Sequence, residues 1–262
     1  MTPRCLDVGT GRPLVLLHGW AAHAGFFAPQ AALAWSGLRV LAPDLPGHGS
    51  NRGQGGSLTL GDLAAAVARL IADRDLTDVV LVGWSLGAAV AFDYIARHGC
   101  DRLGGLVVLD MAPRILNDAD WTLGIAGAFD ARINEAALTA MAADWPAYAA
   151  RFLPRLFARG RDPDPALADW ARAQLAGNDA AAMTSLWRSL AAADHRSVLD
   201  RIAVPALVVN GRQSRIYQPA TSDWLAARIP GARRVTIEDA GHSPQLEQPF
   251  AVNQALATFA GA

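Results

Sequence analysis

The stretch Val79 to Gly99, VVLVGWSLGAAVAFDYIARHG, decides the fold of this chain. Its first residues are β-branched or aliphatic and predict a buried strand, and thirteen helix-forming residues precede Gly99. Between them lies Gly83-Trp84-Ser85-Leu86-Gly87, a G-x-S-x-G turn. Such a sharp turn strains its central residue, and flanking glycines avoid a Cβ that would collide with the strand and the helix. The pattern predicts a strand, a tight turn and a helix, with Ser85 at the carboxyl edge of a sheet.

A serine at this place is typical of an acyl-transfer nucleophile. The Oγ of Ser85 would be exposed, and the backbone N–H of Leu86, in the first turn of the helix, would point toward a developing negative charge. Glycine and serine are also ordinary turn residues. The motif gains its meaning from the buried strand before it and the amphipathic helix after it.

Length and composition indicate one catalytic domain. The chain has 262 residues, of which 52% are hydrophobic, so it can bury a large core. Its net charge of −1 gives no global field that favours nucleic acid or an anionic membrane. Cys5 and Cys100 are the two cysteines, without the spacing of a zinc site or a disulfide framework. We expect a cytoplasmic protein with no metal and no cofactor, since the first residues contain no signal sequence and Gly53-Gln54-Gly55-Gly56 follows no strand.

The rest of the chain alternates between short apolar runs and helical patterns. Thr59 and Asp62 form a capping-box pattern at the start of a helix predicted within Ser57 to Arg74. A glycine-containing turn after Val8 predicts a hairpin between the first two strands. The alternation favours an α/β fold with a mostly parallel central sheet covered by helices on both faces. The other predicted strands are Arg4–Val8, Leu14–His18, Leu38–Ala42, Leu106–Leu109, one within Ile202–Gly211, and Arg233–Ile237.

Between Arg114 and about Asp200 the pattern changes to short helical segments broken by prolines. We interpret residues 114–200 as an inserted helical cap, and residues 1–113 and 201–262 as the core domain. Aromatic residues of the cap would supply its own core, with one or two of them reaching a substrate pocket. These aromatic residues are Trp121, Phe129, Trp145, Phe152, Phe157 and Trp170.

Two residues, Trp20 and His242, join Ser85 and Leu86 in the predicted reaction machinery. Trp20, in His18-Gly19-Trp20 at the end of a strand, would offer its N–H as a second oxyanion donor beside that of Leu86. His242 lies in the loop after the last predicted strand, which suits a general base. The side chains of Trp20, Trp84 and Leu86 would favour an apolar acyl chain. Taken alone, His18 and Gly19 could merely shape a turn, and Trp20 could be core.

The segments His18-Gly19-Trp20, Gly83-Trp84-Ser85-Leu86-Gly87 and Gly241-His242-Ser243-Pro244 resemble the α/β-hydrolase family. This resemblance covers nearly the whole chain, including the cap, and implies a Ser–His–acid triad with an oxyanion hole at Trp20 and Leu86. Within the family, the HGW and GWSLG pair is similar to serine esterases whose substrate is borne by an acyl carrier protein. Family membership alone does not choose a substrate.

The chain departs from the family pattern at the acid. Many relatives place it in a Gly-x-x-Asp segment after the penultimate strand, but here that segment is Gly211-Arg212-Gln213-Ser214, and serine carries no charge. Asp110 follows the strand next to the nucleophile strand and resembles the relocated acid of some family members, so we predict it as the triad acid. Asp110 could instead cap a turn near Pro113. Asp44, Asp223 and Asp239 are weaker alternatives.

These residues predict a serine carboxylesterase that cleaves short- to medium-chain esters. The alternatives are a non-catalytic ligand-binding homologue, which the missing acid at position 214 motivates, and another activity of the same fold, such as a lactonase, a C–C hydrolase or a cofactor-free haloperoxidase. Arg151, Arg155 and Arg159 of the cap, together with Arg161, form either a solvated helix face or a docking site for an acidic acyl carrier protein.

Overall fold

The computed structural model describes residues 5–53 and 57–261, and within them seven strands form one sheet in the order β1-β3-β2-β4-β5-β6-β7. Every neighbouring pair is parallel except β1 and β3. The central strand β4 is buried along its whole length, as expected for a strand covered on both faces. The strands are β1 (Cys5–Val8), β2 (Arg12–Leu17), β3 (Leu38–Pro43), β4 (Val79–Trp84), β5 (Leu103–Leu109), β6 (Ala206–Gly211) and β7 (Arg233–Ile237).

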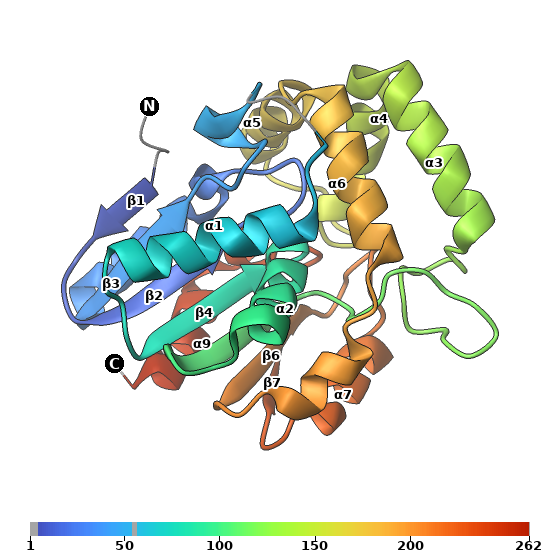
Figure 1. Cartoon of the computed structure of the whole chain (residues 1–262). Coiled ribbons are helices and arrows are strands. Elements are labelled where there is room, and N and C mark those ends of the chain that lie inside the picture. The colour runs from blue at the N-terminus through green and yellow to red at the C-terminus, as the bar shows by residue number, and fades with distance from the viewer. Residues whose placement is uncertain (1–4, 54–56, 262) are drawn as a thin grey trace.

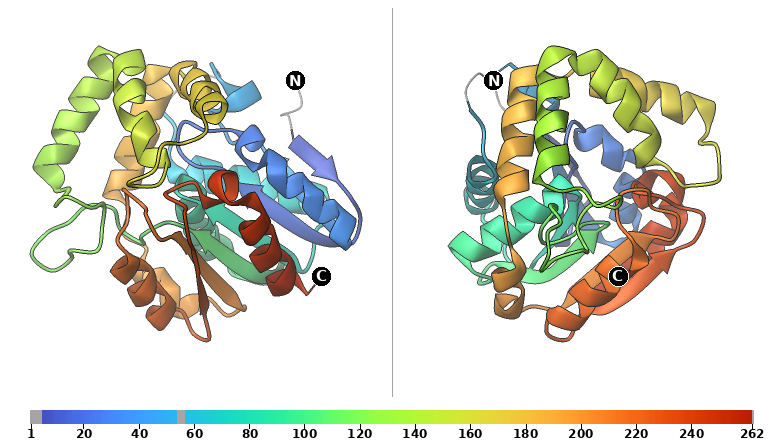
Figure 2. Two further views of the ribbon diagram at one scale, coloured as in Figure 1. Left: turned by 180° about the vertical axis from the view of Figure 1, so that it is seen from behind. Right: turned by 90° about the vertical axis from the view of Figure 1, so that its right-hand side faces the viewer.

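Helices cover both faces of this sheet (Figures 1 and 2). The connections β3-α1-β4 and β4-α2-β5 step across the sheet in one direction, so right-handed crossovers bring α1 (Leu60–Asp73) and α2 (Leu86–His98) to the same face, where they pack together. The 3₁₀ segment η1 (Ala24–Ser36) and helix α9 (Pro249–Ala260) pack together on the opposite face. The remaining core elements are η2 (Gly49–Asn51), α7 (Pro219–Arg228) and α8 (Pro244–Glu247), and η4 (Arg196–Arg201), at the end of residues 114–200, packs on α2.

Two local predictions are confirmed. The α2 helix starts directly after Ser85 and spans Leu86–His98. Thr59 and Asp62 form a complete capping box, in which each side chain accepts the backbone N–H of the other residue, and this fixes the start of α1.

The predicted hairpin between the first two strands is wrong. Strand β1 pairs antiparallel with β3, and β2 lies between β3 and β4. The glycine-containing turn instead carries the chain past the start of β3. Gly9 and Gly11 have positive φ, and a Cβ on either would lie within 2.3 Å of a backbone oxygen of Leu38 or Gly37, so this close passage requires glycine at both positions. Arg4 of the predicted first strand, and positions 54–56 of the predicted glycine loop, lie outside the described residues.

The chain between β5 and β6 forms a helical layer at one end of the sheet (Figures 1 and 2). We call residues 114–200 the cap segment. The chain enters the cap segment after Pro113 and returns to the core after His195. The two connections lie side by side, because the N–H of His195 donates to the carbonyl of Pro113 at 2.9 Å. Prolines start α4 and α5 and lie within η3. The elements of the cap segment are α3 (Ala131–Ala143), α4 (Trp145–Phe152), η3 (Leu153–Leu156), α5 (Pro165–Ala176) and α6 (Ala180–Ala192).

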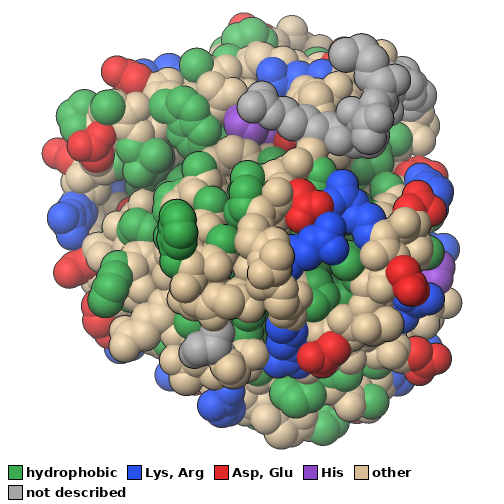
Figure 3. Space-filling view, turned by 90° about the vertical axis from the view of Figure 1, so that its left-hand side faces the viewer, with side chains coloured by type: hydrophobic (Ala, Val, Ile, Leu, Met, Phe, Trp, Pro, Cys, Tyr) green, Lys and Arg blue, Asp and Glu red, His purple; other side chains and the backbone are tan. Residues whose placement is uncertain are grey.

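The surface mixes charges of both signs. On the face drawn in Figure 3, Arg side chains lie among Asp and Glu side chains rather than in a patch of one sign. None of the helices in the described part of the chain is both long enough and apolar enough to cross a membrane.

Candidate active site

The G-x-S-x-G turn around Ser85 has the strained backbone that the sequence pattern implies. Ser85 has φ 52° and ψ −119°, in the left-handed half of backbone space. A Cβ on Gly83 would lie 2.4 Å from the backbone of Ala88, and one on Gly87 would lie 2.0 Å from the carbonyl oxygen of Leu17. Both positions therefore require glycine, and the close packing of β4, α2 and β2 that they allow presents Ser85 at the end of β4.

Two backbone N–H groups flank this position without a partner. Among the hydrogen bonds of the described residues, none uses the N–H of Trp20 or that of Leu86. Leu86 is the first residue of α2, where an N–H has no acceptor within the helix and lies at the positive end of the helix dipole. Both groups can therefore donate hydrogen bonds without losing an existing one, and an oxyanion hole at Trp20 and Leu86 stays a prediction.

The loop that carries Trp20 is clamped at the next residue. Ala21 has φ 59°, and its N–H donates to Nε2 of His48 at 3.2 Å while its carbonyl accepts from Nδ2 of Asn178 at 2.7 Å. His48 comes from the loop after β3, and Asn178 comes from the cap segment. The indole of Trp20 also donates to the carbonyl of Met183 in α6 at 2.9 Å. The core and the cap segment together hold this strained loop in place.

His242 and Asp110 meet at the carboxyl edge of the sheet. The Nδ1 atom of His242 lies 2.7 Å from Oδ2 of Asp110, and both side chains are at least 97% buried. The contact fixes the ring and leaves Nε2 as the nitrogen that can take a proton. Asp110 has φ 45°, so it also has a left-handed backbone conformation where a strand ends. This geometry supplies what a triad needs between acid and base.

The loop of His242 is anchored on both sides. The indole N–H of Trp84 donates to the carbonyl of His242 at 2.6 Å. The half-buried carboxylate of Glu247 accepts the N–H of Gly241 at 2.7 Å and the N–H of Ala158, in the cap segment, at 2.8 Å. Burial raises the pKa of Glu247 above its usual range. Sequence reasoning missed Glu247, although it lies five residues after His242.

Ser85 and His242 line the same narrow cavity of about 30 Å³. Its walls are mostly apolar and come from the core and the cap segment, which places the cap segment over the carboxyl edge of the sheet. Trp20 and Trp84 are among the lining residues, as predicted, whereas the buried side chain of Leu86 is not. The other lining residues are Gly19, Ile115, Ile125, Phe129, Tyr148, Phe152, Arg155, Leu156, Trp187, Leu190, Ile216 and Tyr217.

The six aromatic residues singled out in the cap segment divide into two groups. Phe129 and Phe152 line the cavity, and the other four do not. Trp145 packs against the edge of Trp20, and Trp170 packs on Phe26. Trp121 and Phe157 are buried elsewhere in the core.

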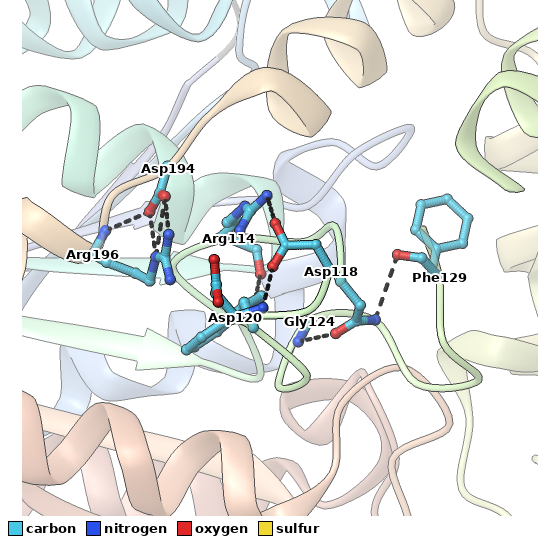
Figure 4. A network of polar contacts seen from close by, with 9 residues as sticks. Arg114, Asp118, Asp120, Gly124, Phe129, Asp194 and Arg196 are labelled. Carbon is cyan, nitrogen blue, oxygen red and sulfur yellow. Dashed lines mark hydrogen bonds and ion pairs between the residues drawn. The ribbon is translucent and has the colours of Figure 1, made fainter. Parts of the chain in front are cut away.

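One wall of the cavity is an irregular loop, residues 114–130, which carries Ile115, Ile125 and Phe129. The side chain of Asn117 lies across it, accepting the N–H of Gly124 at 2.9 Å and donating to the carbonyl of Ile125 at 2.8 Å. Arg114 pairs with Asp118 at the base of the loop, close to a second pair between Arg196 and Asp194 (Figure 4). These polar contacts hold the wall in shape without regular secondary structure.

His18, Asp44, Asp223 and Asp239, which the sequence analysis named, make contacts that stabilise the fold, and so does His48. His18 and His48 are fully buried against each other below the Trp20 loop; burial lowers the pKa of His18 to about 3 and that of His48 well below its usual value. Asp44 accepts the N–H groups of Ala24 and Ser50. Asp223 pairs with Arg234, and Asp239 is an exposed turn residue with φ 53°.

The cap arginines lie at the surface next to the cavity. Arg155 is exposed and lines the cavity, and the guanidinium of Arg151 lies 5.8 Å from the ring centre of Tyr148. Arg159 is exposed a little further along the chain. In the described residues there is no cluster of three or more His, Cys, Asp or Glu side chains that could hold a metal ion.

Several known proteins are similar to this chain in sequence or in fold. Residues 14–255 match the model of the alpha/beta hydrolase family. The chain is 30% identical to the pimeloyl-[acyl-carrier protein] methyl ester esterase of Nitrosomonas europaea over 92% of each chain, and 30% identical to that of Stenotrophomonas maltophilia over 98% of this chain and 96% of the relative. Its fold matches an esterase from Exiguobacterium antarcticum with a TM-score of 0.91 at 23% identity, over 98% of this chain and 95% of that one.

Proposed function

This chain belongs to the α/β-hydrolase family, and from that premise we propose that it is a serine carboxylesterase which cleaves the methyl ester of a medium-length acyl group borne by an acyl carrier protein. The observation that carries the proposal is the buried His242–Asp110 contact beside Ser85 in one apolar cavity. The names of the relatives supply the substrate class. Such a carrier-bound substrate also agrees with the cytoplasmic location expected from the sequence.

Each side chain then has one role in the reaction. Nε2 of His242 takes the proton of Ser85 as Oγ attacks the ester carbonyl, and the N–H groups of Trp20 and Leu86 hold the oxyanion. His242 gives the proton to the leaving alcohol, and the carboxylate of Asp110 stabilises the imidazolium that forms in between. A water molecule, activated by His242, then hydrolyses the acyl-enzyme to the free acid.

The walls of the cavity suit an extended acyl chain. Aromatic and aliphatic side chains from α4, α6 and the 114–130 loop surround the space beyond Ser85 and offer no charged partner except Arg155. Such a lining favours a polymethylene chain over a sugar or a charged group.

The exposed arginines next to the cavity suit an acidic carrier. Arg155 reaches the cavity lining, and Arg151 and Arg159 lie on the same stretch of the cap segment. Charges placed this way accelerate encounter with an acidic protein and do so less at high ionic strength. We therefore assign the carrier protein to this surface, with the acyl chain passing Arg155 into the cavity.

The test compares two substrates that share one ester. Methyl pimelate linked to acyl carrier protein and free dimethyl pimelate are hydrolysed by the parent and by the Arg155→Glu, Arg159→Glu variant. We expect the variant to lose about 10-fold or more in kcat/KM for the carrier-bound ester and, because Arg155 also lines the cavity, to show a smaller loss on the free ester. The matched control, Arg69→Glu, Arg228→Glu, makes the same charge change on α1 and α7 of the core. Equal loss in both variants, or none in either, would reject the docking site; no hydrolysis of any ester by the parent would reject the esterase.

A further inference from the structure

The residue at the family's usual acid position still contacts the triad. We propose that Ser214 is a positioning residue that keeps the carboxylate of Asp110 ionised and aimed at His242. The proposal rests on the esterase function above, because it concerns Asp110 and His242 of the same triad. It gives a role to the residue at which the chain departs from the family pattern. The proposed acid, Asp110, follows β5 instead of β6, and Ser214, at the usual acid position after β6, holds it in place.

The contact joins the ends of neighbouring strands. Ser214 follows β6 and Asp110 follows β5, and the Oγ of Ser214 lies 2.7 Å from Oδ2 of Asp110. The same oxygen lies 2.7 Å from Nδ1 of His242. Ser214 is 92% buried and Asp110 is 99% buried, so solvent weakens neither contact.

Counting protons fixes the direction of these hydrogen bonds. The Oγ of Ser214 accepts the backbone N–H groups of Ile216 and Tyr217, each at 3.2 Å. A serine hydroxyl has two acceptor sites and one proton. With both acceptor sites used, its proton is directed to Asp110. Oδ2 therefore accepts from Ser214 and from His242 and cannot itself bear a proton, and Nδ1 of His242 is the protonated ring nitrogen.

Asp110 has little else to hold its carboxylate. Its other oxygen, Oδ1, is buried and has no hydrogen-bond partner among the described residues. A buried carboxylate needs donors to remain charged. Ser214 supplies one of the two side-chain donors on Oδ2, and it is the one that does not take part in proton transfer. Without it, the carboxylate would turn more freely and bind a proton more readily.

The loss of this donor has a defined effect on pH dependence. A hydrogen bond to the ionised form of a carboxylate stabilises that form, so the removal of Ser214 should move the acidic limb of the pH–rate profile to higher pH. The other ionisable groups near the pair are Tyr217, whose pKa is raised by burial and by the charge of Asp110, Glu247 behind the His242 loop, and Arg155 at the cavity. They are the same in parent and variant, so the shift reports on Ser214.

The experiment uses Ser214→Ala, with Ser214→Thr to restore the hydroxyl and Ser243→Ala as the control. Ser243 is also buried and is next to His242, but its hydroxyl has no partner in the described part of the chain. Hydrolysis of a free methyl ester is measured across pH at a temperature where all proteins are folded by circular dichroism. For Ser214→Ala we expect kcat to fall about 10-fold with KM changed less than about 2-fold, and the acidic limb of kcat/KM to move up by roughly one pH unit. The Ser214→Thr and Ser243→Ala variants should both retain the parent profile.

Two results overturn the proposal. One is a Ser214→Ala enzyme with the parent's kcat and pH profile. The other is a loss of kcat without any shift of the acidic limb and without recovery in Ser214→Thr, which would indicate a purely structural role for the turn. An inactive parent is a different result, because it rejects the esterase function itself.

Discussion

The backbone N–H of Ser85 donates a hydrogen bond of 3.0 Å to the carbonyl oxygen of Leu109, the residue immediately before Asp110. Trp84 and Leu109 are register partners of β4 and β5, so Ser85 and Asp110, the proposed nucleophile and acid, follow the sheet at the same level on adjacent strands. The N–H of Asp110 in turn donates to Val209 in β6 at 2.8 Å. These backbone hydrogen bonds between β4, β5 and β6 place the carboxylate of Asp110 within reach of His242.

This arrangement predicts that the acid can be moved back. Asp110→Asn should lower kcat by about 10³ to 10⁴-fold, since the base loses its charged partner. Adding Ser214→Asp should recover at least about 10-fold, because Oγ of Ser214 already contacts the oxygen that binds His242, and an aspartate can accept the N–H groups of Ile216 and Tyr217 as the serine does. Steady-state kinetics on a free ester measures both.

The control for the acid is Asp239→Asn, which removes an exposed carboxylate close to His242 in sequence and should leave kcat unchanged. A fully active Asp110→Asn enzyme would contradict the assignment of the acid. If the double variant is folded but no more active than Asp110→Asn alone, positions 110 and 214 do not converge on His242 as described.

The clamp on Ala21 predicts a coupled loss of stability and activity. Asn178→Ala leaves the buried carbonyl of Ala21 without its partner, which should cost about 1–3 kcal/mol of unfolding free energy. Because the neighbouring N–H of Trp20 is the proposed oxyanion donor, kcat should fall while KM changes little. Urea unfolding and ester kinetics measure the two effects. A variant that is destabilised with full kcat would show that the clamp does not position the oxyanion hole.

Two of the buried histidines, His18 and His48, predict an acid-sensitive fold. His18 has a pKa of about 3 when folded against about 6.5 when unfolded, so the unfolded chain binds the extra proton in this window. Unfolding free energy should therefore fall as the pH is lowered from about 6.5 toward 3, with His18 contributing at most about 5 kcal/mol. Chemical denaturation at several pH values checks this. In His18→Gln the slope should be smaller, and a slope equal to the parent's would contradict the assignment.

The sequence was sufficient where local sterics decide the structure. Gly83 and Gly87 are required by atoms a few residues away or on the adjacent strand, so their spacing alone predicted the strained turn at Ser85. The capping box of α1 and the strand ends at Trp20 and Asp110 are local in the same way. These features also carry the family resemblance.

It was insufficient where contacts join distant segments. The pairing of β1 with β3 depends on which strand edge is free, which a turn sequence does not reveal. The 114–130 loop has no periodicity, so Ile115 and Ile125 could not be recognised as part of the cavity wall. Ser214 lacks the charge expected of an acid, and its role emerges only from its distance to Asp110.

The most direct measurement is covalent labelling of Ser85, because the reaction proposed here requires a hydroxyl made nucleophilic by His242. The protein is treated with a fluorophosphonate, digested and analysed by mass spectrometry. We expect one phosphonate on Ser85 in the parent, none in Ser85→Ala, and labelling slowed by several orders of magnitude in His242→Ala. An unlabelled but folded parent, or an adduct that persists at another residue in Ser85→Ala, would contradict it and favour a ligand-binding protein without catalysis.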